Sequence, residues 1–177
     1  MSNPGERKAA DTASPPALDP LVLGPTDGDA VWFRDTRVVV KCRAADTDGA
    51  YGLIEVWAPS DSGPALHVHF NEDEFFWILQ GELEVRCGED YFNVGPSGSA
   101  FLPRCIPHSY WVLGDQMARI LIVISPGGGE EFFVSAGVPA KDSGLPTSSP
   151  VDVAALRDAA RRFGGDIIGP PMHSTNQ

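Results

Sequence analysis

The feature that most limits the fold of this chain is the regular spacing of turn-forming residues between positions 31 and 125. Turn formers such as Asp48-Gly49 and Gly95-Pro96 recur about every 8–12 residues. The runs between them are short and rich in β-branched and aromatic residues: Thr36–Cys42, Tyr51–Ala58, Ala65–His69, Glu74–Leu79, Glu82–Cys87, Tyr91–Val94, Ser99–Leu102, His108–Leu113 and Ala118–Ser125. Because parallel strands would need helices between these runs, the spacing predicts an all-β sandwich or barrel.

The segments on either side of this region differ from it in composition. Residues 1–20 contain four prolines among small polar residues, so we expect a disordered arm there. We expect the barrel and a short helix over Glu130–Ala136 within residues 21–137. Residues 138–171 are predicted to form a linker and a helix over Val151–Phe163 packed on the barrel, because its apolar residues recur at helical spacing. Residues 172–177 read as a frayed tail.

The charge of the chain limits its partners. Its 177 residues include 24 acidic and 13 basic side chains, a formal charge of −11. Nucleic acids and anionic lipids attract proteins through Lys and Arg, so we expect neither as a partner and expect a small molecule instead. No run is apolar enough for a membrane span or a signal peptide, and Cys42, Cys87 and Cys105 lack CxxC spacing. These observations favour a cytoplasmic protein with reduced cysteines.

Three of the four histidines lie in the β-rich region and are spaced for metal binding. His67 and His69 are two residues apart, so both side chains point to one face of an extended strand. Glu74 begins the next run, and His108 follows a proline-bounded turn at the start of another. Three imidazoles and one carboxylate suit a divalent ion such as Fe, Mn, Ni, Co or Zn.

Two alternatives stand beside this hypothesis. A His-x-His pair on a strand often serves only in ordinary hydrogen bonding. Glu72 and Asp73 also compete with Glu74 for the role of the carboxylate ligand. The alternation of the strand that begins at Glu74 favours Glu74.

Two segments carry a family resemblance. Gly63-Pro-Ala-Leu-His-Val-His-Phe-Asn-Glu-Asp-Glu74-Phe-Phe-Trp-Ile-Leu-Gln-Gly81 resembles the first motif of the cupin superfamily, and Gly98-Ser-Ala-Phe-Leu-Pro-Arg-Cys-Ile-Pro-His108 resembles the second. The spacing between Gly63 and His67 is shorter than usual, and Cys105 and Val112 replace the usual Gly and Asn. The resemblance implies a single-domain cupin: an all-β, jelly-roll-like double-stranded β-helix barrel with a short C-terminal helical extension. It also implies one metal bound by His67, His69, Glu74 and His108.

The segments after the barrel resemble the tails of bacterial cupins similar to quercetin 2,3-dioxygenase. This resemblance implies a homodimeric oxidoreductase that cleaves an enolisable aromatic or flavonol-like substrate with O₂, with Glu74 as both ligand and catalytic base. Strand alternation makes Phe76, Ile78 and Tyr110 candidate pocket residues. Two other functions remain open: a metal-dependent non-oxidative cyclase, isomerase or decarboxylase, and a non-catalytic small-molecule-binding cupin.

Overall fold

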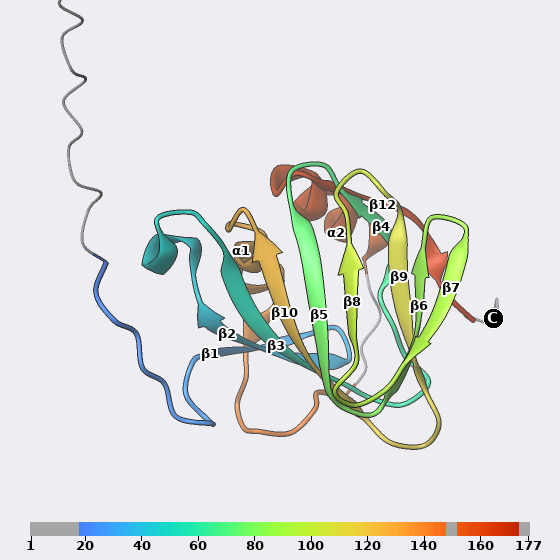
Figure 1. Ribbon diagram of the computed structural model, residues 1–177, viewed down its shortest axis with the longest axis horizontal. Helices are drawn as coiled ribbons and strands as arrows, with labels where there is room; N and C mark the ends of the chain where they lie inside the picture. Colours follow the sequence, from blue (N-terminus) through green and yellow to red (C-terminus); the bar gives the residue numbers. More distant parts are fainter. Residues whose placement is uncertain (1–17, 148–151, 174–177) are drawn as a thin grey trace, which may run out of the picture.

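The computed structural model describes residues 18–147 and 152–173 and consists mainly of two antiparallel sheets (Figure 1). The first sheet has the strand order β11-β1-β2-β3-β10-β5-β8, and the second has the order β12-β4-β9-β6-β7. The strands are β1 (Asp29–Phe33), β2 (Thr36–Cys42), β3 (Gly52–Ala58), β4 (Ala65–His69), β5 (Asp73–Gln80), β6 (Glu82–Cys87), β7 (Asp90–Val94), β8 (Ser99–Leu102), β9 (His108–Leu113), β10 (Ala118–Ser125), β11 (Val138–Pro139) and β12 (Gly165–Pro171). The all-β fold predicted from the sequence is confirmed.

Strand β10 illustrates how the sequence produces this fold. Ala118, Ile120, Ile122 and Ile124 are buried, and the residues between them are more exposed. This alternation matches the two-residue period of a strand with one face on the core. β10 lies between β3 and β5, and Ile124 stands opposite Glu74 in the β10–β5 pair. An interior strand of the larger sheet thus fixes the position of Glu74.

One apolar core joins the two sheets. Its buried members come from the inner faces of both, for example Ile54 and Ile120 from the first sheet and Leu83 and Val112 from the second. Burial of such side chains contributes about 1.5–3 kcal/mol each. The core therefore holds the sheets face to face, and residues at the end of this interface can meet across it.

The helical segments are short. A 3₁₀ turn, η1, spans Ala44–Thr47, and α1 spans Glu130–Ala136. Helix α2 spans Val153–Arg162 and is capped by the preceding Asp152, whose carboxylate accepts a hydrogen bond from the N–H of Ala155 at 3.0 Å. The two α-helices contact each other, and α2 also contacts β12 (Figure 1). They form the helical extension that the sequence predicts.

Three strands were not anticipated from the sequence. β1, β11 and β12 carry no strong β-pattern, and β12 contains two glycines and two prolines. It is an edge strand that pairs with β4, with Ile167 opposite His67 and Gly165 opposite His69. Proline is tolerated at such an edge because one side of the strand has no ladder partner. Thus the segment expected to contain only a linker and a helix also adds a strand beside the two histidines.

Several expectations concern segments of which little or nothing is described. Residues 1–17 of the predicted N-terminal arm and residues 174–177 of the predicted tail lie outside the described residues. Within the described ranges, no helix has both the length and the apolar character needed to cross a membrane.

Candidate metal centre

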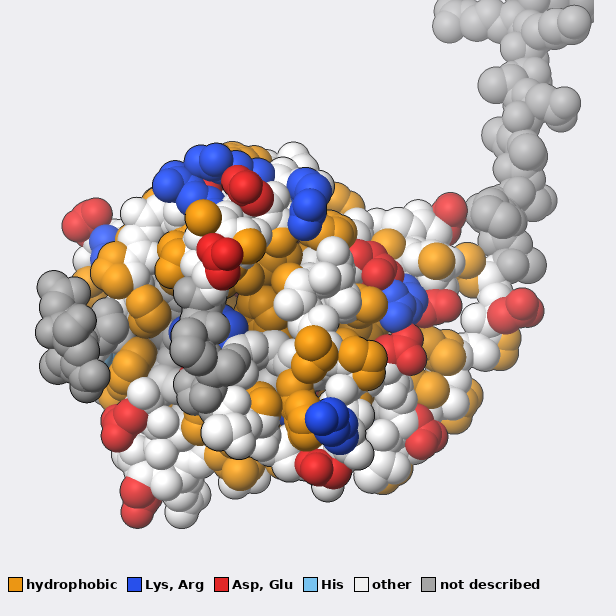
Figure 2. Space-filling model, turned by 180° about the vertical axis from the view of Figure 1, so that it is seen from behind, with side chains coloured by type: hydrophobic (Ala, Val, Ile, Leu, Met, Phe, Trp, Pro, Cys, Tyr) orange, Lys and Arg blue, Asp and Glu red, His pale blue; other side chains and the backbone are white. Residues whose placement is uncertain are grey.

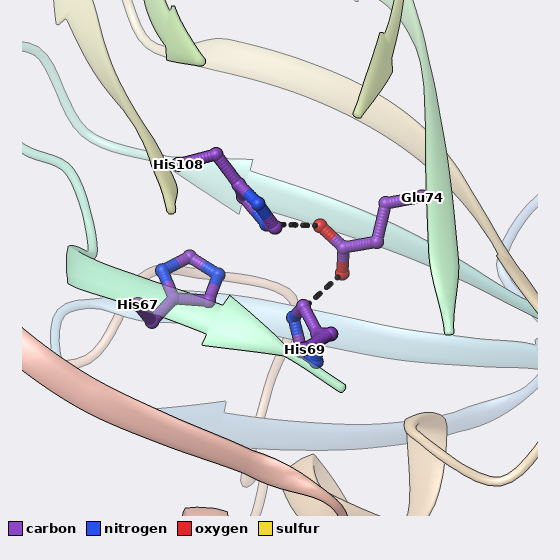
Figure 3. A group of neighbouring side chains, drawn as sticks. All are labelled: His67, His69, Glu74 and His108. Atoms are coloured by element: carbon purple, nitrogen blue, oxygen red, sulfur yellow. Dashed lines mark ion pairs between the residues drawn. The ribbon is translucent and has the colours of Figure 1, made fainter. Parts of the chain in front are cut away.

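Three histidines and one glutamate converge between the two sheets (Figure 3). His67 and His69 project from β4, and His108 begins β9 opposite His67 in the β4–β9 pair. Glu74 approaches from β5 in the other sheet. One nitrogen or oxygen atom of each residue lies within 4.8 Å of the others. The structure therefore brings together the four residues singled out in the sequence.

Backbone carbonyls orient two of the imidazoles. The Nδ1 atom of His67 lies 2.8 Å from the carbonyl oxygen of Ala65, and that of His108 lies 2.9 Å from the carbonyl oxygen of Ile106. A carbonyl can only accept, so each Nδ1 carries a proton, and in the neutral imidazole Nε2 then keeps a free lone pair. Such outer contacts commonly fix the tautomer of histidines that bind metals.

Two inner nitrogens of the cluster have no hydrogen-bond partner among the described residues. The Nε2 atoms of His69 and His108 are buried and unsatisfied. They lie 3.5 Å and 3.3 Å from the two carboxylate oxygens of Glu74, without the alignment of a hydrogen bond. Buried polar atoms are rarely left unpaired without a reason. Their convergence on one carboxylate fits a divalent cation chemically.

Burial and the charges of neighbouring cluster residues shift the pKa values within the cluster. Burial, together with the neighbouring His108 and His69, lowers the pKa of His67 to about 3. Burial raises the pKa of Glu74, but His69 and His108 outweigh it and hold the net value at about 2. Burial lowers the pKa of His108, yet the neighbouring carboxylate of Glu74 raises it overall. At neutral pH, His67 is neutral and Glu74 is ionised, which are the forms that bind metals.

The alternative carboxylates occupy different places. Asp73 pairs with the side chain of Arg104 at 2.7 Å and accepts a hydrogen bond from its backbone N–H. Glu72 is buried behind His69, with one oxygen 3.8 Å from Nδ1 of that imidazole. Of the three competing acidic residues, Glu74 is the one whose carboxylate lies in the cluster.

Two small cavities adjoin the cluster. The inner one, of about 70 Å³, is lined by Phe76 and Tyr110 together with His67 and Glu74. Ile78 lines neither of the two cavities and lies fully buried in the core. Its side chain follows Phe76 along β5 and so lies deeper in the barrel. Ile78, which the sequence suggests as a pocket residue, is therefore a core residue in the structure and does not line either cavity.

The outer cavity, of about 100 Å³, is lined mainly by residues that sequence analysis did not connect with the site. Its aromatic wall comes from β1, α1 and the residue after α2: Phe33, Phe132, Phe133 and Phe163. In Figure 2, which looks onto the molecule from behind, hydrophobic side chains gather around a hollow. The helical extension thus forms much of the roof over the cluster, an arrangement that no local sequence pattern signals.

Comparisons with known proteins give a consistent result. Residues 53–124 match the family model described as the cupin domain. A quercetin 2,3-dioxygenase from Bacillus subtilis is 25% identical over 128 residues, which amount to 72% of this chain. The same alignment covers 38% of that relative, so the chain spans well under half of its length.

Solved structures support the fold. A predicted oxalate decarboxylase from Thermotoga maritima has a TM-score of 0.55 at 18% identity, covering 59% of this chain and 98% of its own. An RmlC-like cupin from Shewanella frigidimarina has a TM-score of 0.54 at 12% identity, covering 64% of this chain and 96% of its own. At such low identity these similarities establish the architecture alone.

Proposed function

We propose, from the premise that this protein is a cupin similar to the quercetin dioxygenase-like cupins, that it is a metal-dependent dioxygenase. Its substrate would be an enolisable aromatic or flavonol-like molecule. The observation that carries the proposal is the buried cluster of three histidines and one glutamate beside an aromatic-lined cavity. The similarity to a quercetin 2,3-dioxygenase supports the oxidative reaction over the alternatives.

His67, His69, Glu74 and His108 would hold one divalent transition metal. Imidazole and carboxylate ligands accept Fe, Mn, Ni, Co and Zn, so the ligand set leaves the choice among these ions to metal availability. The unsatisfied Nε2 atoms of His69 and His108 support this assignment, because a cation would satisfy both at once. The ion would lower the pKa of a substrate hydroxyl bound beside it.

Other steps, namely proton transfer and binding of the substrate ring, would fall to side chains that line the cavities. Glu74 would accept the proton of the substrate hydroxyl, since its ionised carboxylate is at the cavity wall. Phe76 and the aromatic residues of the roof would hold a flat ring and exclude water. Burial raises the pKa of Tyr110 above its usual range, so its hydroxyl stays protonated and can donate a hydrogen bond.

Metal content is the first test. Protein purified without chelator should contain about one transition-metal ion per chain. His67→Ala should lose most of this metal, because it removes one of four ligands. His173→Ala is the matched control, since His173 is exposed and pairs with Glu84 instead. Metal-free wild-type protein, or equal metal content in both variants, would contradict the metal site.

Oxygen consumption is the second test and separates the candidate reactions. The metal-loaded protein should consume O₂ in the presence of quercetin or another enolisable aromatic, and His67→Ala should not. A non-oxidative cyclase, isomerase or decarboxylase would turn over its substrate at the same rate under argon. A small-molecule-binding cupin would bind the same compounds without converting them.

We also propose that the protein is a homodimer that acts in the cytoplasm on a small molecule. Strand β8 is an edge of the larger sheet, and the outer face of β5 and β8 exposes Phe75, Trp77 and Phe101. Exposed apolar side chains beside a free edge favour association. Light scattering after size exclusion should give twice the chain mass, and Phe101→Lys should shift it towards the monomer.

A further inference from the structure

We infer that Arg34 binds an anionic group of the substrate, so that the enolisable aromatic substrate also carries a carboxylate. This inference rests on the proposed function, because it names what enters the cavities beside the metal cluster. Arg34 lies in the two-residue turn between β1 and β2, after Phe33 and before Thr36. Its side chain lines both the outer and the inner cavity, which also share His67 and Glu74. A cationic residue therefore lines both cavities that adjoin the cluster.

The guanidinium of Arg34 is available to a ligand. Its Nε atom is buried without a hydrogen-bond partner, and its side chain makes no ion pair within residues 18–147 and 152–173. Arginine presents a planar fork of donors that matches the two oxygens of a carboxylate. A buried donor without an acceptor is unfavourable, so a bound carboxylate would satisfy a group that is now unsatisfied.

None of the acidic side chains that line these cavities pairs with Arg34. Asp166 lines the outer cavity, but its carboxylate already accepts hydrogen bonds from the guanidinium groups of Arg157, at 2.7 Å, and Arg161, at 3.2 Å. Asp35 lines the inner cavity and makes no ion pair with Arg34. Glu74 belongs to the metal cluster. Arg34 is half-buried and lines both cavities, and among the described residues its positive charge has no acidic partner.

The backbone at Arg34 adds a second observation. Its φ angle is +57°, in the left-handed region where residues other than glycine are uncommon. A turn of this kind favours glycine, and strained residues tend to persist where they have a function. Arg37 offers a contrast, because its Nε is also buried without a partner but it lines neither cavity. The position of Arg34 at the cavities, more than the orphaned nitrogen, identifies it as a binding residue.

The apolar and the cationic residues that line the outer cavity indicate the chemistry of the ligand. Four phenylalanine rings provide an apolar surface for an aromatic ring, and Arg34 provides a donor for a negative group. The chain has a net charge of −11, which repels anions at long range and makes a local cation necessary for binding one. An aromatic carboxylate combines both requirements in one small molecule.

The test uses benzoate and benzamide, which have the same shape and differ in charge. Calorimetric titration should show that wild-type protein binds benzoate about tenfold or more tightly than benzamide. Arg34→Gln and Arg34→Gly should abolish this preference, and the glycine variant should fold normally because it suits the positive φ. Arg37→Gln is the matched control and should keep the wild-type preference.

Each titration is done on chelator-treated and on zinc-loaded protein, so that the metal site and Arg34 are tested separately. Dependence on Arg34 in both forms supports the inference, even if the metal tests fail. The inference is overturned if wild-type protein does not bind benzoate, or if it binds benzoate and benzamide equally. It is also overturned if benzoate binds Arg34→Gln as tightly as wild type, since the carboxylate would then be held by another group.

Discussion

Replacing Glu130 by glutamine should destabilise the protein through the backbone groups that its carboxylate satisfies. Glu130 is fully buried in the first turn of α1. One of its oxygens accepts a hydrogen bond from the N–H of Ala44 at 2.6 Å, and the other accepts from the N–H of Gly128 at 2.7 Å. A glutamine amide has only one accepting oxygen, so one of these N–H groups would face another donor. The change keeps the size of the side chain and removes one acceptor.

The expected magnitude follows from these two hydrogen bonds. A buried N–H without an acceptor costs about 1–3 kcal/mol, and the remaining bond loses about 1 kcal/mol when its acceptor becomes neutral. Burying an amide is less unfavourable than burying a carboxylate, which offsets part of this loss. We expect the free energy of unfolding to fall by about 2 kcal/mol. For a chain of this size, that corresponds to a decrease in Tm of about 4–8 °C.

Denaturant unfolding followed by tryptophan fluorescence measures this loss. Glu89→Gln is the matched control, because that side chain is 99% exposed and should change stability by less than about 0.5 kcal/mol. If Glu130→Gln changes stability as little as the control does, the two hydrogen bonds are not what holds α1 in place.

A double-mutant cycle with Gly52 sharpens the test. A side chain at position 52 would overlap the carboxylate of Glu130. Gly52→Ala should therefore be strongly destabilising in the wild-type background and much less so in Glu130→Ala, where the space is free. Additive effects of the two changes would show that these residues do not share the space the structure assigns to them.

Three further predictions concern the cluster and its supports. Gly63→Ala should lower stability by about 1–3 kcal/mol because its methyl group would overlap the carbonyl oxygen of Tyr110, whereas Gly95→Ala, which meets no atoms, should be neutral in the same melts. The α2 arginines lower the pKa of Asp166 from 3.8 to about 2, so its contribution to stability is present above pH 3.8 and is lost as the pH falls towards 2. Asp166→Asn should therefore be less stable than wild type at pH 7, and this difference should shrink as the pH falls through about 2; an unchanged difference would refute the assignment. Zinc should raise the Tm of chelator-treated wild-type protein but not of His108→Ala, and an equal rise in both would argue against His108 as a ligand.

The sequence predicts most of the barrel because its strands alternate locally. Ala65–His69, Glu82–Cys87 and Ala118–Ser125 agree with the observed strands residue for residue. Their side chains face a buried core on one side, which leaves a two-residue pattern in the sequence. β12 leaves no such pattern, because it gains its place by pairing with β4 at an edge and contains residues that disfavour strands. Its position depends on the folded barrel and cannot be deduced from its own residues.

The same distinction applies to the site. His67 and His69 are neighbours in sequence, so their common face follows from strand geometry alone. Glu72 and Arg34 are different, because their positions beside the site depend on how a loop and a hairpin turn pack against the finished barrel. The aromatic roof is equally non-local, since Phe33 and Phe163 come to line one cavity only after the sheets and helices have assembled. Sequence patterns identify the proposed ligands but not the walls around them.

The proposed metal-binding residues and much of the roof come from separate segments of the chain. The four cluster residues all come from the segment that ends at His108, whereas much of the roof follows position 129. Changes in the later segment can reshape the opening while the earlier one keeps its chemistry intact. Exchanging or remodelling the segment after position 129 could therefore change which molecules enter the cavity while the four cluster residues stay in place. Chimaeras joined within residues 126–129, between β10 and α1, would test this separation in the laboratory.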